Sequence, residues 1–137
     1  MTLTLIIFLP LLNISILGVF GRFLGLKSIK FITFLNLGLT LLSTIFLFFL
    51  NIKGYFFYCN LGVWLHLDFF LINWGFIFDA ISTSMLFIVY FVSFFVHFYS
   101  FEYMSTDPHV IRFIGLLSLF TFFMAFLICS DNFILLF

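Results

Sequence analysis

The chain has 137 residues, of which 66% are hydrophobic and only 7% charged, and its formal net charge is zero. Soluble domains carry about a quarter charged residues, so this composition excludes a water-soluble globular protein and predicts an integral membrane protein. The neutral charge balance gives no indication of a nucleic-acid partner. Phe alone contributes 27 residues, a bias typical of a U-rich coding sequence, which suggests an organelle gene.

Charged residues divide the chain into spans, because an ionised side chain at the bilayer centre costs about 2.5–3.5 kcal/mol. The charge-free stretches predict four transmembrane helices, at about residues 2–21, 31–52, 80–101 and 113–130. At about 1.5 Å per residue, each comes close to the ~30 Å hydrocarbon thickness. Residues 131–137 are too short to cross and are interpreted as the start of a further helix that Asp131 caps. The expected fold is an all-α integral membrane protein forming a single membrane segment over residues 1–137.

The Lys and Arg residues predict an orientation, because they collect in loops on the inner side of a membrane. With the N-terminus outside, the inner side holds Arg22, Lys27, Lys30 and Arg112, and the outer side holds only Lys53. The N-terminus is therefore predicted on the outer side of the membrane.

The segment between the second and third predicted helices, residues 54–78, is apolar but interrupted by glycine and polar residues. A continuous span is not expected there. From Leu61 to Phe69 the apolar residues partly alternate with the others, which is the period of a strand. This segment therefore predicts a short β-hairpin at the outer surface, where Trp64 and Trp74 are suited to the membrane interface.

A line of polar residues follows the third predicted helix. Asp79, Thr83, Tyr90, Ser93 and His97 lie at offsets of 0, 4, 11, 14 and 18 residues, and at about 100° per residue they project on one face. One interpretation is a hydrogen-bonded path along which His97 exchanges protons. The other is a packing stripe, because hydroxyl groups commonly join membrane helices. Asp79 also suits a cap at the start of the helix.

Small and polar residues in two other helices predict helix–helix contacts. In the fourth predicted helix, Gly115, Ser118, Ala125 and Cys129 form a small-residue face, and Asn13 marks a contact of the first helix. These helices are expected to pack as a bundle.

The sequence contains no nucleotide-binding glycine loop, nucleophile elbow or redox pair. Cys59 and Cys129 lie far apart and have no His at ligand spacing, so no metal site is expected. The chain is expected to bind no cofactor and to have no catalytic centre of its own. Any chemistry is then ion movement through a bundle assembled with other segments.

Five runs of residues are similar, in order and spacing, to parts of a known family. They are 73–79 (NWGFIFD), 96–100 (VHFYS), 107–109 (DPH), 117–124 (LSLFTFFM) and 131–133 (DNF). These runs resemble chain 5 of NADH–ubiquinone oxidoreductase, respiratory complex I, from its third helix to the start of its fifth. The first two predicted helices match that family only in hydropathy and in the outward hairpin.

This resemblance implies the N-terminal part of an antiporter-like, proton-translocating subunit in the membrane arm of complex I, in the mitochondrial inner membrane. It implies other membrane-arm subunits and lipids as partners, with NADH, FMN, iron–sulfur clusters and ubiquinone bound elsewhere in the complex. Among the matching residues, it adds Tyr99 to His97 and Asp79 as candidates for the proton path. The alternative is a structural helix bundle of a respiratory complex, without a direct part in proton transfer.

The family's chains are several times longer, and the resemblance implies that a Gly-Trp-Glu motif in their fifth helix carries a glutamate that moves protons. This sequence stops at Phe137, before that motif. We expect a subunit split between two polypeptides, the second of which supplies the remaining helices. The alternative is one longer chain of which this sequence is a part.

Overall fold

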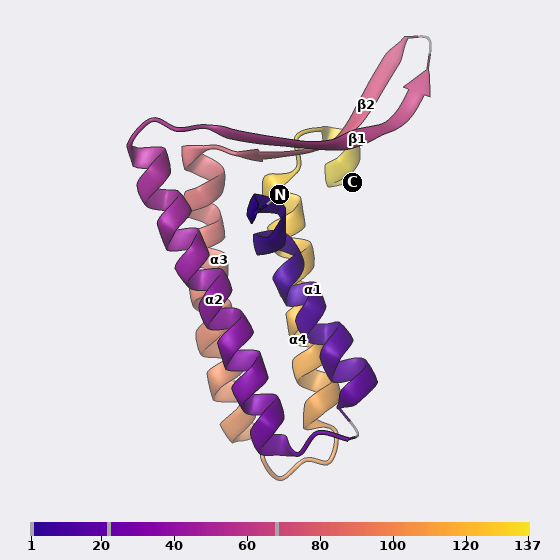
Figure 1. The fold of residues 1–137 in the computed structure, drawn as a ribbon. Helices are drawn as coiled ribbons and strands as arrows, with labels where there is room; N and C mark the ends of the chain where they lie inside the picture. The colour runs from indigo at the N-terminus through magenta and orange to yellow at the C-terminus, as the bar shows by residue number, and fades with distance from the viewer. Residues whose placement is uncertain (1, 22, 68) are drawn as a thin grey trace.

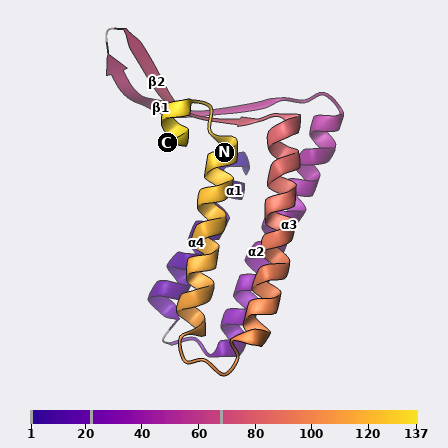
Figure 2. The same ribbon diagram turned by 180° about the vertical axis from the view of Figure 1, so that it is seen from behind.

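The computed structural model describes residues 2–21, 23–67 and 69–137. The elements in chain order are α1 (Thr2–Phe20), α2 (Leu26–Ile52), β1 (Phe57–Leu67), β2 (Phe70–Phe78), α3 (Ala80–Tyr103), α4 (Val110–Cys129) and α5 (Phe133–Leu136). The four long helices form a bundle in which α1 packs against α4, and α2 against α3 (Figure 1). The hairpin of β1 and β2 lies across one end of this bundle, and both chain termini lie at the same end (Figure 2).

Three helices, α2, α3 and α4, are long and apolar enough to cross a membrane. The apolar part of the first helix, α1, covers Ile6–Phe20 and is shorter than those three helices. The mainly helical membrane architecture agrees with the sequence. That α1 forms a fourth span stays a prediction. The one two-stranded sheet of the described residues is the hairpin predicted between the second and third helices.

Three helix ends extend beyond the predicted bounds. The second helix begins at Leu26 and not at 31, the third ends at Tyr103 and not at 101, and the fourth begins at Val110 and not at 113. The prediction ended each helix at a charged residue. Lys30 and Arg112 nevertheless lie in terminal turns, since their long side chains can reach the interface while the backbone stays helical. Arg22 lies outside the described residues.

The predicted hairpin is present and is longer than expected. Its strands pair antiparallel from Phe57 opposite Phe78 to the turn, with irregular register on either side of Val63. At this irregularity, a β-bulge, Gly62 has a φ of +146°, and its N–H donates to Asn60 Oδ1 at 3.0 Å. A side chain rarely adopts that backbone conformation, so glycine suits the position.

The base of the hairpin takes part in the core. Phe76 and Phe78 of β2 are fully buried and belong to one cluster with Leu86 of α3 and Phe122 of α4. A second cluster at the opposite end of the bundle joins the helices through Leu17, Ile29, Phe101, Val110 and Ile114. The hairpin therefore closes one end of the bundle, and aliphatic and aromatic packing closes the other.

Three hydrogen bonds tie the hairpin to the segment after α4. The Tyr58 hydroxyl donates to Asp131 Oδ2 at 3.0 Å, the Asp131 N–H to the Gly75 carbonyl at 3.1 Å, and Asn132 Nδ2 to the Asn73 carbonyl at 3.2 Å. The prediction that Asp131 caps the following helix is wrong. Asn132 holds the N-cap position of α5, because the backbone pairing with Gly75 directs the Asp131 carboxylate to Tyr58.

The bond between Tyr58 and Asp131 makes this contact sensitive to alkaline pH. The hydrogen bond to the carboxylate raises the pKa of Tyr58 above its ordinary value near 10. Only the protonated hydroxyl donates, so the contact is complete below pH 10 and is lost as pH rises through the raised pKa. We expect Asp131→Asn to lower the pKa of Tyr58 in a tyrosinate absorbance titration, with Tyr58→Phe identifying the signal. A titration that Asp131→Asn leaves unchanged would contradict the contact.

Candidate functional site

The polar line of α3 divides into buried and exposed members. Thr83, Tyr90 and His97 are buried at 1% exposure or less, and Ser93 is half-buried. These four lie on the face that meets the other helices, because residues spaced three, four or seven positions apart lie on the same side of a helix. Asp79 is exposed, so it lies outside the interior part of the line.

Asp79 holds the N-cap position of α3, but its carboxylate makes no capping hydrogen bond. Its backbone carbonyl accepts hydrogen bonds from Thr83 Oγ1 at 2.6 Å and from Asn51 Nδ2 at 3.3 Å. Asn51 Nδ2 also donates to Thr83 Oγ1 at 2.7 Å. The end of the line nearest the hairpin is thus a junction between α2 and α3, and the predicted side-chain cap is not formed.

Tyr99 lies away from the other candidates. Its side chain is 66% exposed, and its ring stacks on that of Tyr103 with 5.7 Å between centroids. Two residues along a helix correspond to about 200° of rotation. Tyr99 therefore faces almost opposite to His97.

The interior part of the line is also interrupted. Leu86, fully buried, lies between Thr83 and Tyr90. The Tyr90 hydroxyl donates to the Ile6 carbonyl of α1 at 3.0 Å. Among the residues that the structure describes, no hydrogen bond joins Tyr90 to Thr83 or Ser93, so only Ser93 and His97 form a connected polar site.

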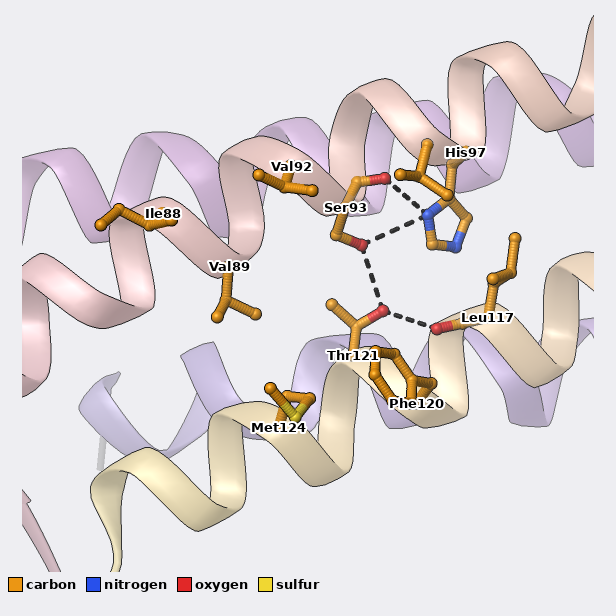
Figure 3. Close-up of a pocket in the computed structure, with 10 residues that line it drawn as sticks. Ile88, Val89, Val92, Ser93, His97, Leu117, Phe120, Thr121 and Met124 are labelled. Carbon is orange, nitrogen blue, oxygen red and sulfur yellow. Dashed lines mark hydrogen bonds between the residues drawn. The ribbon is translucent and has the colours of Figure 1, made fainter.

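Ser93 and His97 join α3 to α4 by a chain of hydrogen bonds (Figure 3). His97 Nδ1 lies 2.7 Å from the Ser93 carbonyl and 3.3 Å from Ser93 Oγ. Ser93 Oγ lies 3.1 Å from Thr121 Oγ1, which donates to the Leu117 carbonyl at 2.6 Å. A carbonyl only accepts, so Nδ1 carries a hydrogen and the Ser93 hydroxyl donates onward to Thr121.

The other ring nitrogen connects His97 to α1 through a serine of α4. His97 Nε2 lies 3.2 Å from Ser118 Oγ, and Asn13 Nδ2 donates to the same oxygen at 2.7 Å. Asn13 and Ser118 are fully buried. The sequence marked both as helix contacts, but periodicity along single helices carried no signal that they meet at His97.

A cavity of about 290 Å³ lies between α3 and α4 beside this network (Figure 3). Its lining surface is almost entirely apolar, and Ser93, His97 and Thr121 are the polar residues that border it. An ionisable group beside such a space can exchange a proton with a small donor that enters it.

No group of three His, Cys, Asp or Glu side chains lies close enough to hold a metal ion among the described residues. The groups that can carry out proton chemistry at this site are His97 and its hydroxyl partners. An imidazole can hold or release a proton, and the hydroxyls can both donate and accept.

The fold and this site define a polytopic membrane helix bundle with a buried, hydrogen-bonded histidine. Residues 64–114 match the family model described as NADH–ubiquinone oxidoreductase (complex I), chain 5 N-terminus. Over these residues the chain is similar in sequence to the N-terminal part of NADH–ubiquinone oxidoreductase chain 5.

Curated relatives named NADH–ubiquinone oxidoreductase chain 5 extend this match over most of the chain. The protein of Acanthamoeba castellanii is 46% identical over 129 residues, which are 93% of this chain and 19% of the relative. That of Triticum aestivum is 42% identical over 134 residues, 97% of this chain and 20% of the relative. The chain therefore spans about a fifth of the length of the curated relatives it matches.

Proposed function

We propose that the chain is the N-terminal part of a proton-translocating subunit in the membrane arm of NADH–ubiquinone oxidoreductase. The observation that carries this proposal is the 46% identity over 93% of the chain with a chain 5 protein. The three helices suited to crossing a membrane agree with such a place. On this proposal the chain has no catalytic centre and binds no cofactor, while NADH, FMN, iron–sulfur clusters and ubiquinone bind elsewhere in the complex.

Within that subunit, we assign the proton-carrying role to His97. Ionisable side chains inside a membrane are rare and usually functional. His97 is 1% exposed, has partners for both ring nitrogens and borders a cavity. These features support a group that changes its protonation state inside the bundle.

A second candidate function is structural support without proton transfer. The interruption of the polar line at Leu86 favours it, because a path along α3 alone would need a donor or acceptor there. The test of this alternative is the His97→Gln variant, which retains hydrogen bonding but not basicity: normal NADH-driven proton transport by this variant would support the structural role.

The partners proposed for the chain are the remaining helices of the subunit, neighbouring membrane-arm subunits and lipids. Large apolar side chains such as Phe46, Phe91 and Phe95 are about half exposed or more on the described bundle surface. Such side chains need apolar contact. The remaining helices come either from a second polypeptide, as the split subunit requires, or from further residues of the same one.

The orientation proposed is multi-pass in the mitochondrial inner membrane, with the N-terminus and the hairpin in the intermembrane space. Lys27, Lys30 and Arg112 lie at the end of the bundle opposite to the hairpin, and Lys53 lies at the hairpin end. A membrane-impermeant thiol reagent applied from the intermembrane-space side should then label Cys59 of the hairpin, which is partly exposed, and leave buried Cys129 unmodified. Labelling of Cys59 only from the matrix side would reverse the orientation.

Depleting the chain tests the functional proposal. Proton transport driven by NADH should fall in membranes that lack it, while transport driven by succinate should remain because succinate oxidation bypasses the proposed complex. Unchanged NADH-driven transport after depletion would overturn the proposal.

A further inference from the structure

We propose that Ser118 is a hydroxyl switch that lets His97 gain and lose a proton without movement of either side chain. The inference rests on the proposed function, and it assigns a positioning role to a residue of α4. Ser118 Oγ lies within hydrogen-bond distance of three groups: Asn13 Nδ2 at 2.7 Å, the Ile114 carbonyl at 3.0 Å and His97 Nε2 at 3.2 Å. A hydroxyl has one hydrogen and two lone pairs, so three neighbours restrict how it can be arranged.

The neutral form of His97 has one arrangement that gives a partner to both ring nitrogens and to the Ser118 hydroxyl. Nδ1 carries its hydrogen toward the Ser93 carbonyl, which leaves Nε2 as an acceptor. The hydroxyl hydrogen of Ser118 then points to Nε2. The Ile114 carbonyl still accepts from the helical backbone of α4.

The protonated form has a second arrangement that uses the same heavy-atom positions. The Ser118 hydrogen first rotates from Nε2 to the Ile114 carbonyl, which frees the single lone pair of Nε2. Hydronium then transfers a proton to Nε2, forming an N–H bond, and leaves as water, and the positive charge stays on the ring. The new N–H donates to Ser118 Oγ. Release of the proton to water reverses both changes, so the switch requires only rotation about the serine C–O bond.

Asn13 keeps Ser118 in place for both arrangements. The hydroxyl hydrogen of Ser118 already has two acceptors in the Ile114 carbonyl and His97, so the complementary third partner is a donor, which the Asn13 amide supplies. This bond occupies one lone pair in both states and fixes α1 against α4. The Asn13 Oδ1 atom is buried and has no hydrogen-bond donor among the described residues.

The groups facing His97 are uncharged in this part of the structure. They come from α1 (Asn13), α3 (Ser93) and α4 (Ser118), with Thr121 beyond Ser93. On the facing side of α2, Lys30 pairs with Glu102 at 2.9 Å, five residues beyond His97 along α3. When His97 gains or loses a charge, only neutral groups can reorient around it. Among them, Ser118 is the residue whose hydrogen bond to His97 must reverse direction.

The test replaces Ser118 in the assembled complex and measures NADH-driven proton transport in vesicles. Ser118→Ala removes the acceptor for protonated His97, and we expect transport to fall about tenfold, less than the 10²–10⁴-fold typical of removing an acid–base group itself, because His97 is still present. Ser118→Thr keeps the hydroxyl and should restore most of the transport. Ser84→Ala is the matched control, because Ser84 makes a similar bond to its own helix, Oγ to the Ile81 carbonyl at 2.7 Å, away from His97.

Two further measurements distinguish the switch from a structural role. The amount of assembled complex on a native gel should be the same for Ser118→Ala and Ser84→Ala, and the pH at which transport is half-maximal should shift by about one unit only in Ser118→Ala. Normal transport and an unshifted pH profile in Ser118→Ala would overturn the switch. If His97→Gln also transports normally, the proposed role of His97 fails with it, whereas a defective His97→Gln beside a normal Ser118→Ala overturns the switch alone.

Discussion

The His97→Gln variant is expected to lose about nine-tenths or more of NADH-driven proton transport while the complex still assembles. Gln has an amide N–H that can donate toward the Ser93 carbonyl and an oxygen that can accept from Ser118, the two bonds that His97 makes. It cannot take up a proton at physiological pH. Loss of a positioned acid–base group lowers a proton-transfer rate by about 10²–10⁴, so a tenfold decrease is a conservative expectation.

The measurement is the rate of acidification of vesicles that contain the intact complex, with NADH oxidation recorded in parallel. Tyr99→Phe serves as the control, since Tyr99 is exposed on the far side of the same helix and keeps its aromatic ring in the variant. Equal transport by His97→Gln and the parent would assign His97 to packing and would favour the structural alternative.

The Phe76→Ala variant is expected to lower the free energy of unfolding by about 3–5 kcal/mol. Phe76 has no exposed surface and packs edge-to-face against Phe126 of α4, with 5.1 Å between ring centroids. Its backbone also bridges to Ser130, so the residue joins the hairpin to the end of α4. Removing the ring leaves a cavity where β2 meets the bundle.

Thermal unfolding in detergent, followed by circular dichroism, measures this loss as a lower midpoint. Leu71→Ala on the same strand is the matched control, because its side chain is 64% exposed and its removal leaves no cavity. Similar midpoints for Phe76→Ala and Leu71→Ala would contradict the account of a hairpin base that packs as core.

Charge distribution and hydropathy predicted most of the fold, because both follow from local sequence. The helices and the hairpin lie close to their expected positions, and the errors concern helix ends. Lys30 and Arg112 show the reason: a charged residue in a terminal turn does not end the backbone hydrogen bonding. A rule that ends spans at charges therefore makes such helices too short.

The candidate site was predictable only in part. The periodicity of α3 placed Thr83, Tyr90 and His97 on one face, and they are buried. Tyr99 was named from a family resemblance alone, although a two-residue step from His97 rotates it to the far face. The periodicity of one helix does not specify which residues of its neighbours it meets.

The convergence on His97 depends on how three helices approach one another. Asn13 and Ser118 are 105 positions apart, and their bond requires α1 to lie against α4 at one rotation and height. Small residues on α4, such as Gly115 and Ala125, permit that close approach without specifying it. The network is therefore a property of tertiary packing.

The central claim, that this chain works within NADH–ubiquinone oxidoreductase, is tested most directly by the composition of that complex. The complex is isolated from native membranes by its NADH-oxidising activity, and its subunits are identified by intact-mass spectrometry and sequencing. We expect this sequence in an amount equal to the other membrane-arm subunits, either as a chain of 16.1 kDa or within a longer polypeptide. Its absence from an active, proton-pumping complex would contradict the account.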